Sequence, residues 1–243
     1  MKSLITAILL ILTSCVSQRV GEVETIEIST NSDGKGNKFI LEFIKGPAHN
    51  HPSMALWIEN LEGTYIETLF VTQFVATGTY KHGDLGQGSW SNKPGEARRP
   101  ASLPYWAHKR GTKASDGLYI PSIKDPLPDA LTAATPKGNF VLKTSLSSLQ
   151  EGKFKIMLEI NQPWDSNKFW TNNRYPDDKD YFTSLQPSLV YSAVIDPSET
   201  GEPVFLNPVG HGHPSGSGGK LFTDLTTLTT AKEIIHSVSI RTK

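Results

Sequence analysis

Apolar and polar residues alternate at every second position along much of this chain, and that pattern predicts β-strands. Residues 23–29, Val-Glu-Thr-Ile-Glu-Ile-Ser, show it clearly. Side chains two positions apart in an extended chain point to the same side, so each such segment buries one face and exposes the other. The predicted strands are residues 23–29, 38–44, 54–59, 65–71, 140–144, 154–160, 189–196, 204–206 and 234–240.

Turn residues separate these strands, and no long stretch shows a helical repeat. The Asn-Leu-Glu-Gly turn at residues 60–63 forms the clearest hairpin, and residues 74–75 extend its second strand. Many short strands with such turns favour an all-β fold, an antiparallel β-sandwich with long irregular loops. Residues 222–228 fit either a loop or one or two helical turns.

A long insertion interrupts the pattern near residues 78–136, where Gly, Pro, Ser, Lys and Asp dominate. Loops of this length are commonly lids or binding loops, or they contain short elements of their own. Residues 102–108 predict a single helical turn that packs its aromatic side chains on the sheet. For the aromatic residues of the insertion, we expect anchoring in the core ahead of ligand stacking. They are Trp90, Tyr105, Trp106 and Tyr119.

The N-terminus predicts export. Residues 1–14 combine a lysine, a short apolar run and small residues, as in a secretory signal peptide. Cys15 follows Leu-Thr-Ser, which resembles the lipobox of bacterial lipoproteins, so we expect lipidation of Cys15 and a lipidated tether over residues 15–22. No aspartate follows the cysteine, which favours an outer membrane location facing the periplasm. Secretion without lipid is the alternative, and residues 23–243 form a single β-sandwich domain on either prediction.

Charge and cysteine content limit which ligands the chain is expected to bind. Lysine plus arginine equals aspartate plus glutamate, 24 each, and without a basic stripe the chain is not expected to bind nucleic acid. Cys15 is the only cysteine. Its lipidation would leave no thiolate, so any metal would need histidine, carboxylate or carbonyl ligands.

Four histidines form two copies of a His-x-His-Pro pattern, His49 with His51 and His211 with His213. Imidazoles two positions apart point the same way on an extended chain, and neutral imidazole binds zinc, copper or iron. If the fold brings the pairs together, four nitrogens would converge on one transition metal. The alternative is that these histidines bond to backbone groups in ordinary loops.

Aromatic and Asp/Asn residues gather in residues 161–180. Aromatic faces stack on sugar rings and carboxylates accept hydrogen bonds from hydroxyl groups, so this loop suggests a carbohydrate-binding module. The candidate contacts are Trp164, Trp170, Tyr175 and Asp177. A solvated loop and a calcium site are the alternatives.

Parts of the chain between residues 40 and 160 resemble a bacterial periplasmic family of unknown function. Residues 57–60 and 63–69 match its Trp-x-Glu hairpin with a Thr-Leu ending, 103–106 its Leu-Pro-x-Trp segment, and 129–135 its Asp-Ala-x-Thr-Gly-Ala-Thr segment. The resemblance implies an immunoglobulin-like sandwich. It also implies PepSY-type membrane proteins and flavin transferases as partners, in a setting of iron uptake and envelope redox.

The third segment also resembles the motif in which flavin transferases attach FMN to threonine through a phosphoester. Thr135 would be the acceptor, with Asp129 and Thr132 beside it. Ala133 replaces the motif's glycine, and Pro136 follows the acceptor. The alternative is a loop entering a strand, in which Asp129 and Thr132 make local backbone hydrogen bonds.

The chain contains no nucleophile elbow, phosphate loop, dinucleotide-binding glycine pattern or His-Glu-x-x-His sequence. We therefore expect a lipid-anchored envelope binding protein, not an enzyme, that takes a transition metal through its histidine pairs. A covalent FMN carrier for electron transfer and a carbohydrate-binding module are the two alternatives.

Overall fold

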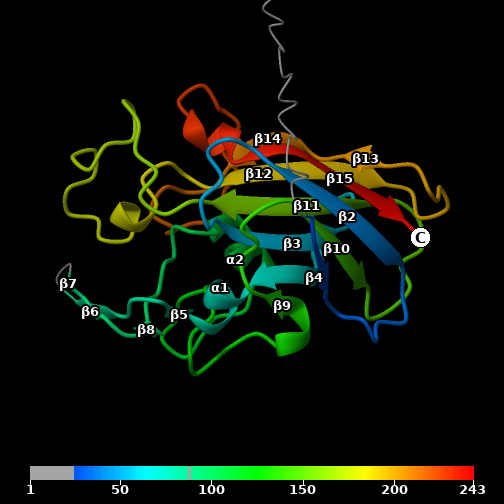
Figure 1. Cartoon of the computed structure of the whole chain (residues 1–243), viewed down its shortest axis with the longest axis horizontal. Helices are drawn as coiled ribbons and strands as arrows, with labels where there is room; N and C mark the ends of the chain where they lie inside the picture. The colour runs from blue at the N-terminus through cyan, green and yellow to red at the C-terminus, as the bar shows by residue number, and fades with distance from the viewer. Residues whose placement is uncertain (1–24, 87–88) are drawn as a thin grey trace, which may run out of the picture.

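The computed structural model describes residues 25–86 and 89–243, which form two facing β-sheets (Figure 1). This confirms the predicted all-β sandwich. The predicted signal peptide, Cys15 and the tether lie outside the described residues. Within the described part, none of the helices has the length and apolar character needed to cross a membrane.

The first sheet has five strands in the order β1-β10-β2-β15-β13. Its pairs are antiparallel except β1 with β10, which run parallel at one edge. The strands are β1 (Ile26–Ser29), β2 (Lys38–Lys45), β10 (Phe140–Ser145), β13 (Val204–Phe205) and β15 (Ile235–Thr242).

The second sheet has six strands in the order β14-β12-β11-β3-β4-β9. It is also antiparallel except at one edge, where β4 pairs in parallel with β9. The strands are β3 (Ser53–Glu59), β4 (Tyr65–Thr72), β9 (Thr132–Ala133), β11 (Phe154–Asn161), β12 (Leu189–Ile195) and β14 (Asn207–His211).

Alternation along β3 divides its side chains between two cores. Leu56 and Ile58 pack in the layer between the sheets, whereas Ala55 and Trp57 join a second cluster on the outer face of the second sheet. Every residue of β3 is therefore buried. A strand covered on both faces shows a continuous apolar run, which explains the Met-Ala-Leu-Trp-Ile sequence of this segment.

Helix α2 (Pro104–Arg110) covers that outer face, with Trp106 fully buried. The predicted helical turn is thus confirmed, together with the packing of its aromatic residues. Helix α1 (Gln73–Thr77) follows β4 directly and ends at Gly78, whose φ of 64° is the left-handed conformation that glycine adopts readily. The prediction that residues 74–75 extend the β4 strand was therefore wrong.

A buried carboxylate attaches α2 to the sheet. Glu159 of β11 accepts hydrogen bonds from the backbone N–H groups of Tyr105 (3.1 Å) and Trp106 (2.7 Å), and from the Ser188 hydroxyl. The residue that precedes the helix, Leu103, makes no side-chain cap. Glu159 therefore satisfies the free N–H groups of the first turn from a neighbouring strand.

The glycine-rich stretch of residues 207–219, which contains the second histidine pair, packs against Glu159 and the segment before α2. A side chain at Gly212 would lie 2.9 Å from Oε1 of Glu159, and one at Gly216 would lie 2.2 Å from the Pro100 backbone. These glycines permit close approach of the loop to the segment before α2. Residues 207–211, which lie outside the strands predicted from the sequence, form the edge strand β14.

Short elements occupy the remaining loops. Two small two-stranded sheets, which we call ribbons, lie in residues 79–96. One pairs β5 (Thr79–Tyr80) with β8 (Gly95–Glu96), and the other pairs β6 (Asp84–Gly86) with β7 (Ser89–Trp90). Single 3-10 turns are η1 (Asp129–Leu131), η2 (Tyr181–Thr183) and η3 (Thr230–Glu233). Residues 222–228 are not helical.

Replacing Glu159 by alanine is predicted to lower the free energy of unfolding by about 3–5 kcal/mol. The change leaves two buried N–H groups and a hydroxyl without an acceptor, each at a cost of about 1–3 kcal/mol. Glu27→Ala is the matched control, because its carboxylate is exposed in an ion pair with Lys143, and it should change stability by less than about 1 kcal/mol. Urea unfolding measures both. Equal losses in the two variants would contradict the anchoring role of Glu159.

The same carboxylate predicts a pH dependence. Burial raises the pKa of Glu159 to about 7, from 4.5. The folded state then binds the proton more tightly than the unfolded chain, so the free energy of unfolding falls as pH rises through this window, by up to about 3 kcal/mol. In Glu159→Gln this component should vanish. Urea unfolding from pH ~4.5 to ~7.5 tests it, and parallel curves for wild type and variant would refute it.

Candidate functional site

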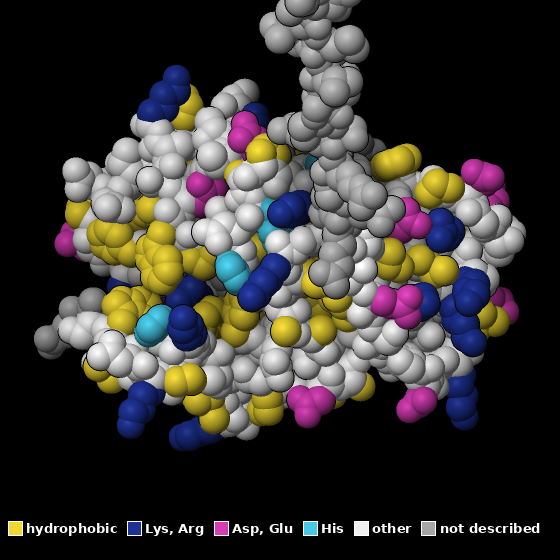
Figure 2. Space-filling view, in the orientation of Figure 1, with side chains coloured by type: hydrophobic (Ala, Val, Ile, Leu, Met, Phe, Trp, Pro, Cys, Tyr) yellow, Lys and Arg dark blue, Asp and Glu magenta, His cyan; other side chains and the backbone are white. Residues whose placement is uncertain are grey.

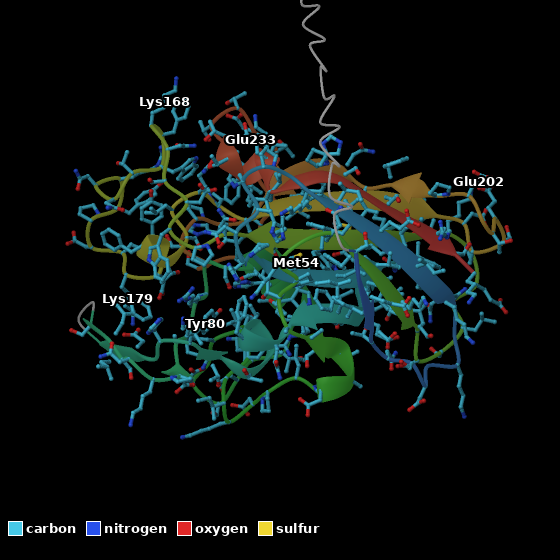
Figure 3. All side chains as sticks on the ribbon, in the orientation of Figure 1. Met54, Tyr80, Lys168, Lys179, Glu202 and Glu233 are labelled. Atoms are coloured by element: carbon cyan, nitrogen blue, oxygen red, sulfur yellow. The ribbon has the colours of Figure 1, made fainter. Side chains whose placement is uncertain are left out.

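A cleft of about 980 Å³ opens between two segments that are distant in the sequence. One wall comes from the ribbons of residues 79–100, and the other from the loop of residues 162–188 that joins β11 to β12. Both segments lie at the left end of the sandwich in Figure 1, opposite the C-terminus. Tyr80 and Lys179, labelled in Figure 3, belong to one segment each.

Two tryptophans line this cleft, which we call the tryptophan cleft. Trp90 lies in β7, and Trp164 follows the end of β11. Their ring centroids are 6.0 Å apart and the ring planes are nearly perpendicular, at 88°. The residues are 36% and 56% exposed. Hydrophobic side chains also gather on the molecular surface at this end (Figure 2). Two large aromatic surfaces therefore remain open to a ligand.

Backbone hydrogen bonds hold Trp164 in an unfavourable left-handed backbone conformation. Its φ is +55°, which costs a non-glycine residue about 1–3 kcal/mol. The backbone N–H of Trp164 donates to the Thr183 carbonyl at 3.3 Å, and that of Asp165 to the Ser184 carbonyl at 3.1 Å. Such strain persists only where the surroundings fix it, and it commonly marks a functional position.

Behind the tryptophans lies Arg99, which is only 6% exposed. Its guanidinium carbon stands 4.0 Å from the Tyr80 ring centroid, 4.9 Å from that of Trp164 and 5.6 Å from that of Trp90. Burial lowers the pKa of Arg99, and the charges of Tyr80 and Asp84 oppose this shift. The stacked arginine holds the rings of both walls together.

Carboxylates surround the aromatic surfaces. The charged residues that line the cleft are Asp84, Glu96, Asp116, Asp177 and Asp180, together with Arg98 and Lys179. Partial burial raises the pKa of Asp180, with Asp178 and Asp84 adding to the shift and Lys179 opposing it. Such groups accept hydrogen bonds from hydroxyl or amide donors of a ligand. The cleft thus combines stacking surfaces with polar groups that can orient what is stacked.

Of the four residues predicted to contact a sugar, two line the tryptophan cleft and two do not. Trp164 and Asp177 line the tryptophan cleft. Trp170 is only 5% exposed, and its indole N–H donates to the Thr227 hydroxyl at 3.1 Å. Tyr175 packs edge-on against Tyr181 at 4.9 Å. Neither Trp170 nor Tyr175 lines the cleft. Trp170 packs against Tyr181 and His211, and Tyr175 is 38% exposed but lies outside the lining.

Sequence analysis did not identify the contribution of the opposite wall. Trp90 was expected to anchor the core, and instead it is exposed in the cleft, whereas Tyr105 and Trp106 are buried as expected. Arg99 was not singled out. The adjacent arginines at positions 98 and 99, close to an isolated tryptophan, were the available signal. Nothing in that signal shows that residues 90 and 164 meet.

The two histidine pairs are not brought together. The strand register places His211 opposite Leu189 of β12, Ile160 of β11 and Met54 of β3 in turn. Met54 is three residues beyond the first histidine pair and lies three strand spacings, roughly 14 Å, from His211. Within residues 25–86 and 89–243, no three His, Cys, Asp or Glu side chains are grouped to hold a metal ion. The structure therefore gives the predicted metal no complete ligand set.

Each histidine has local contacts instead. His49 packs edge-on against Phe43 at 5.8 Å, and His51 bonds through Nδ1 to the Asn50 side chain at 2.9 Å. The His211 ring stacks on Phe222 at 5.2 Å, and its Nδ1–H donates to the Gly212 carbonyl at 2.7 Å. His213 accepts at Nδ1 from the Ser215 backbone N–H at 3.2 Å. Burial is the main cause lowering the pKa of His49, His211 and His213.

The predicted flavin acceptor is enclosed. The Thr135 hydroxyl is buried and has no hydrogen-bond partner among residues 25–86 and 89–243. Thr132 forms part of β9 and donates to the Asp129 carbonyl at 3.2 Å. This is the local backbone bond of the alternative interpretation. A transferase would need the Thr135 segment to open before the hydroxyl could attack a phosphate.

Comparisons with known proteins add no constraint, because no family model, curated protein or solved structure matches this chain. The family resemblance, the immunoglobulin-like topology and the envelope location therefore stay predictions from the sequence.

Changing all four histidines to alanine is predicted to leave the zinc content of the purified chain unchanged. The reason is the separation of the pairs and the use of His211 and His213 in local contacts. Native mass spectrometry after equilibration with zinc measures the content. One equivalent of zinc on wild type that disappears in the variant would contradict this expectation and restore the metal site.

Proposed function

We propose that this chain is a cell-envelope protein that binds a saccharide in the tryptophan cleft. The observation that carries the proposal is the presence of two exposed tryptophans, from different segments, in one cleft with carboxylates around them. Sugar rings present an apolar face of C–H groups and a rim of hydroxyls. The first packs on an aromatic surface and the second needs polar partners.

The size and rigidity of the cleft support this function. Sites for small ligands usually enclose about 300–1,000 Å³, and this cleft, at about 980 Å³, has room for more than one sugar ring. Hydrogen bonds fix the backbone at Trp164, and its ring already packs against Trp90 and Arg99, so part of its freedom is lost before a ligand stacks on it. Such preorganisation strengthens binding.

The other two functions predicted from the sequence have less support. The metal site lacks a group of ligands among the described residues, and the flavin acceptor hydroxyl of Thr135 is buried. Anchoring through a lipid on Cys15 remains part of the proposal on the strength of the sequence alone. It would hold the cleft near glycans of the cell envelope or its surroundings.

Replacing Trp164 or Trp90 by alanine should weaken saccharide binding about tenfold or more, equivalent to ~1.4 kcal/mol, because each loses a stacking surface. A glycan array first identifies a ligand of the full-length chain, and isothermal titration calorimetry then measures its affinity. Phe205→Ala is the matched control, because Phe205 is 57% exposed and lies on β13, away from the cleft.

Three results would count against this function. The first is that wild type retains no glycan on the array, and the second is that both tryptophan variants bind as tightly as wild type. The third is that the Phe205 variant loses as much affinity as the tryptophan variants do. Thermal unfolding of each variant separates lost binding from lost folding.

A further inference from the structure

Arg99 is a buried cation, and the charge of Asp84 acts on it from beyond ion-pair distance. Among the described residues, the guanidinium forms no ion pair and donates no hydrogen bond. Its Nε is sealed from solvent and unpartnered, and within the described part of the chain the two terminal nitrogens also lack a partner but are not sealed. The guanidinium lies beside Trp90 and Trp164, the two rings that line the cleft, whereas Arg99 itself does not belong to the lining.

The neighbouring arginine shows the usual arrangement. Arg98 forms an ion pair with Asp116 and donates to the Ile120 carbonyl. Buried charges in proteins are normally paired and hydrogen-bonded in this way. Stacking on aromatic rings offsets part of the charge of Arg99. It leaves the planar fork of N–H donors unused, and that fork matches a carboxylate or sulfate group.

We propose that the saccharide bound in the tryptophan cleft is acidic, and that its carboxylate or sulfate group pairs with the guanidinium of Arg99. This inference rests on the proposed function and names the class of ligand. The sugar ring stacks on the exposed surface of Trp164, and its anionic substituent points past the ring toward the terminal nitrogens of Arg99.

The carboxylates of the cleft limit the position of the anion. Asp84, Asp177 and Asp180 repel a negative group that stays in the open part of the cleft. Through solvent at physiological salt this repulsion decays over about 8 Å. A direct contact with a partly desolvated guanidinium is screened far less. The three carboxylates therefore accept hydrogen bonds from hydroxyl groups of the saccharide, while its anionic group is placed next to Arg99.

The test compares matched ligands by isothermal titration calorimetry with the full-length chain. The ligands are a uronic acid oligosaccharide, the same oligosaccharide with its carboxylates reduced to alcohols, and a sulfated oligosaccharide. Wild type should bind at least one of the acidic ligands tenfold or more tightly than the reduced one. Which acidic ligand binds more tightly distinguishes a carboxylate from a sulfate.

Variants then assign the preference to Arg99. Arg99→Met keeps an apolar stem against the rings and removes the charge, so it should bind acidic and reduced ligands equally. Arg99→Lys keeps the charge without the fork and should lose most of the preference. Arg174→Met is the control, because Arg174 also stacks on a tryptophan, with its guanidinium carbon 4.1 Å from the Trp170 ring centroid, but that tryptophan does not line the cleft.

The outcomes separate this inference from the proposed function. If wild type binds the reduced ligand as tightly as the acidic ones, saccharide binding stands and the inference is overturned. The same holds if Arg99→Lys and Arg99→Met keep the full preference. If no saccharide binds wild type, the proposed function fails. If Arg99→Met does not fold, the wild-type preference and the Arg99→Lys variant still decide the inference.

Discussion

The carboxylate of Glu159 is the contact on which the arrangement of this molecule depends. It sits fully buried on β11, yet it accepts hydrogen bonds from the first turn of α2 and from Ser188. Because burying an ionised or unpaired carboxyl is costly, the group is compatible with the fold only if all these donors stay in place. One side chain thereby fixes α2, strand β11 and the residue that precedes β12 relative to one another.

That anchor has consequences for the cleft. The chain that enters α2 carries Arg99, whose backbone carbonyl accepts from the Ser102 N–H at 3.0 Å just before the helix begins. The glycine-rich stretch closes over the same segment, with Gly216 against Pro100. The backbone at Arg99 is thus fixed by these contacts, while its guanidinium packs among Tyr80, Trp90 and Trp164. The stretch that carries the second histidine pair therefore supports the cleft through packing.

Strand positions followed from the sequence because alternation and apolar runs are local properties. Residues 38–44 and 154–160 became β2 and β11 with ends shifted by one residue. Elements set by tertiary contacts were missed. Edge strand β14 contains Pro208 and pairs with β12 through a register shift. Helix α1 replaces the predicted extension of β4. The sequence predicted one wall of the cleft, because Trp164 and Asp177 lie in the same loop. Trp90 and Arg99 are distant in the sequence and come close to that loop only in the folded chain.

The central claim is that a saccharide stacks on Trp90 and Trp164. The chain has five tryptophans, and each gives its own indole N–H signal in a nuclear magnetic resonance spectrum. Titrating a saccharide selected on the glycan array should shift the signals of Trp90 and Trp164 and leave those of Trp57, Trp106 and Trp170 in place. Shifts confined to the three buried tryptophans, or no shift at saturating ligand, would contradict the account.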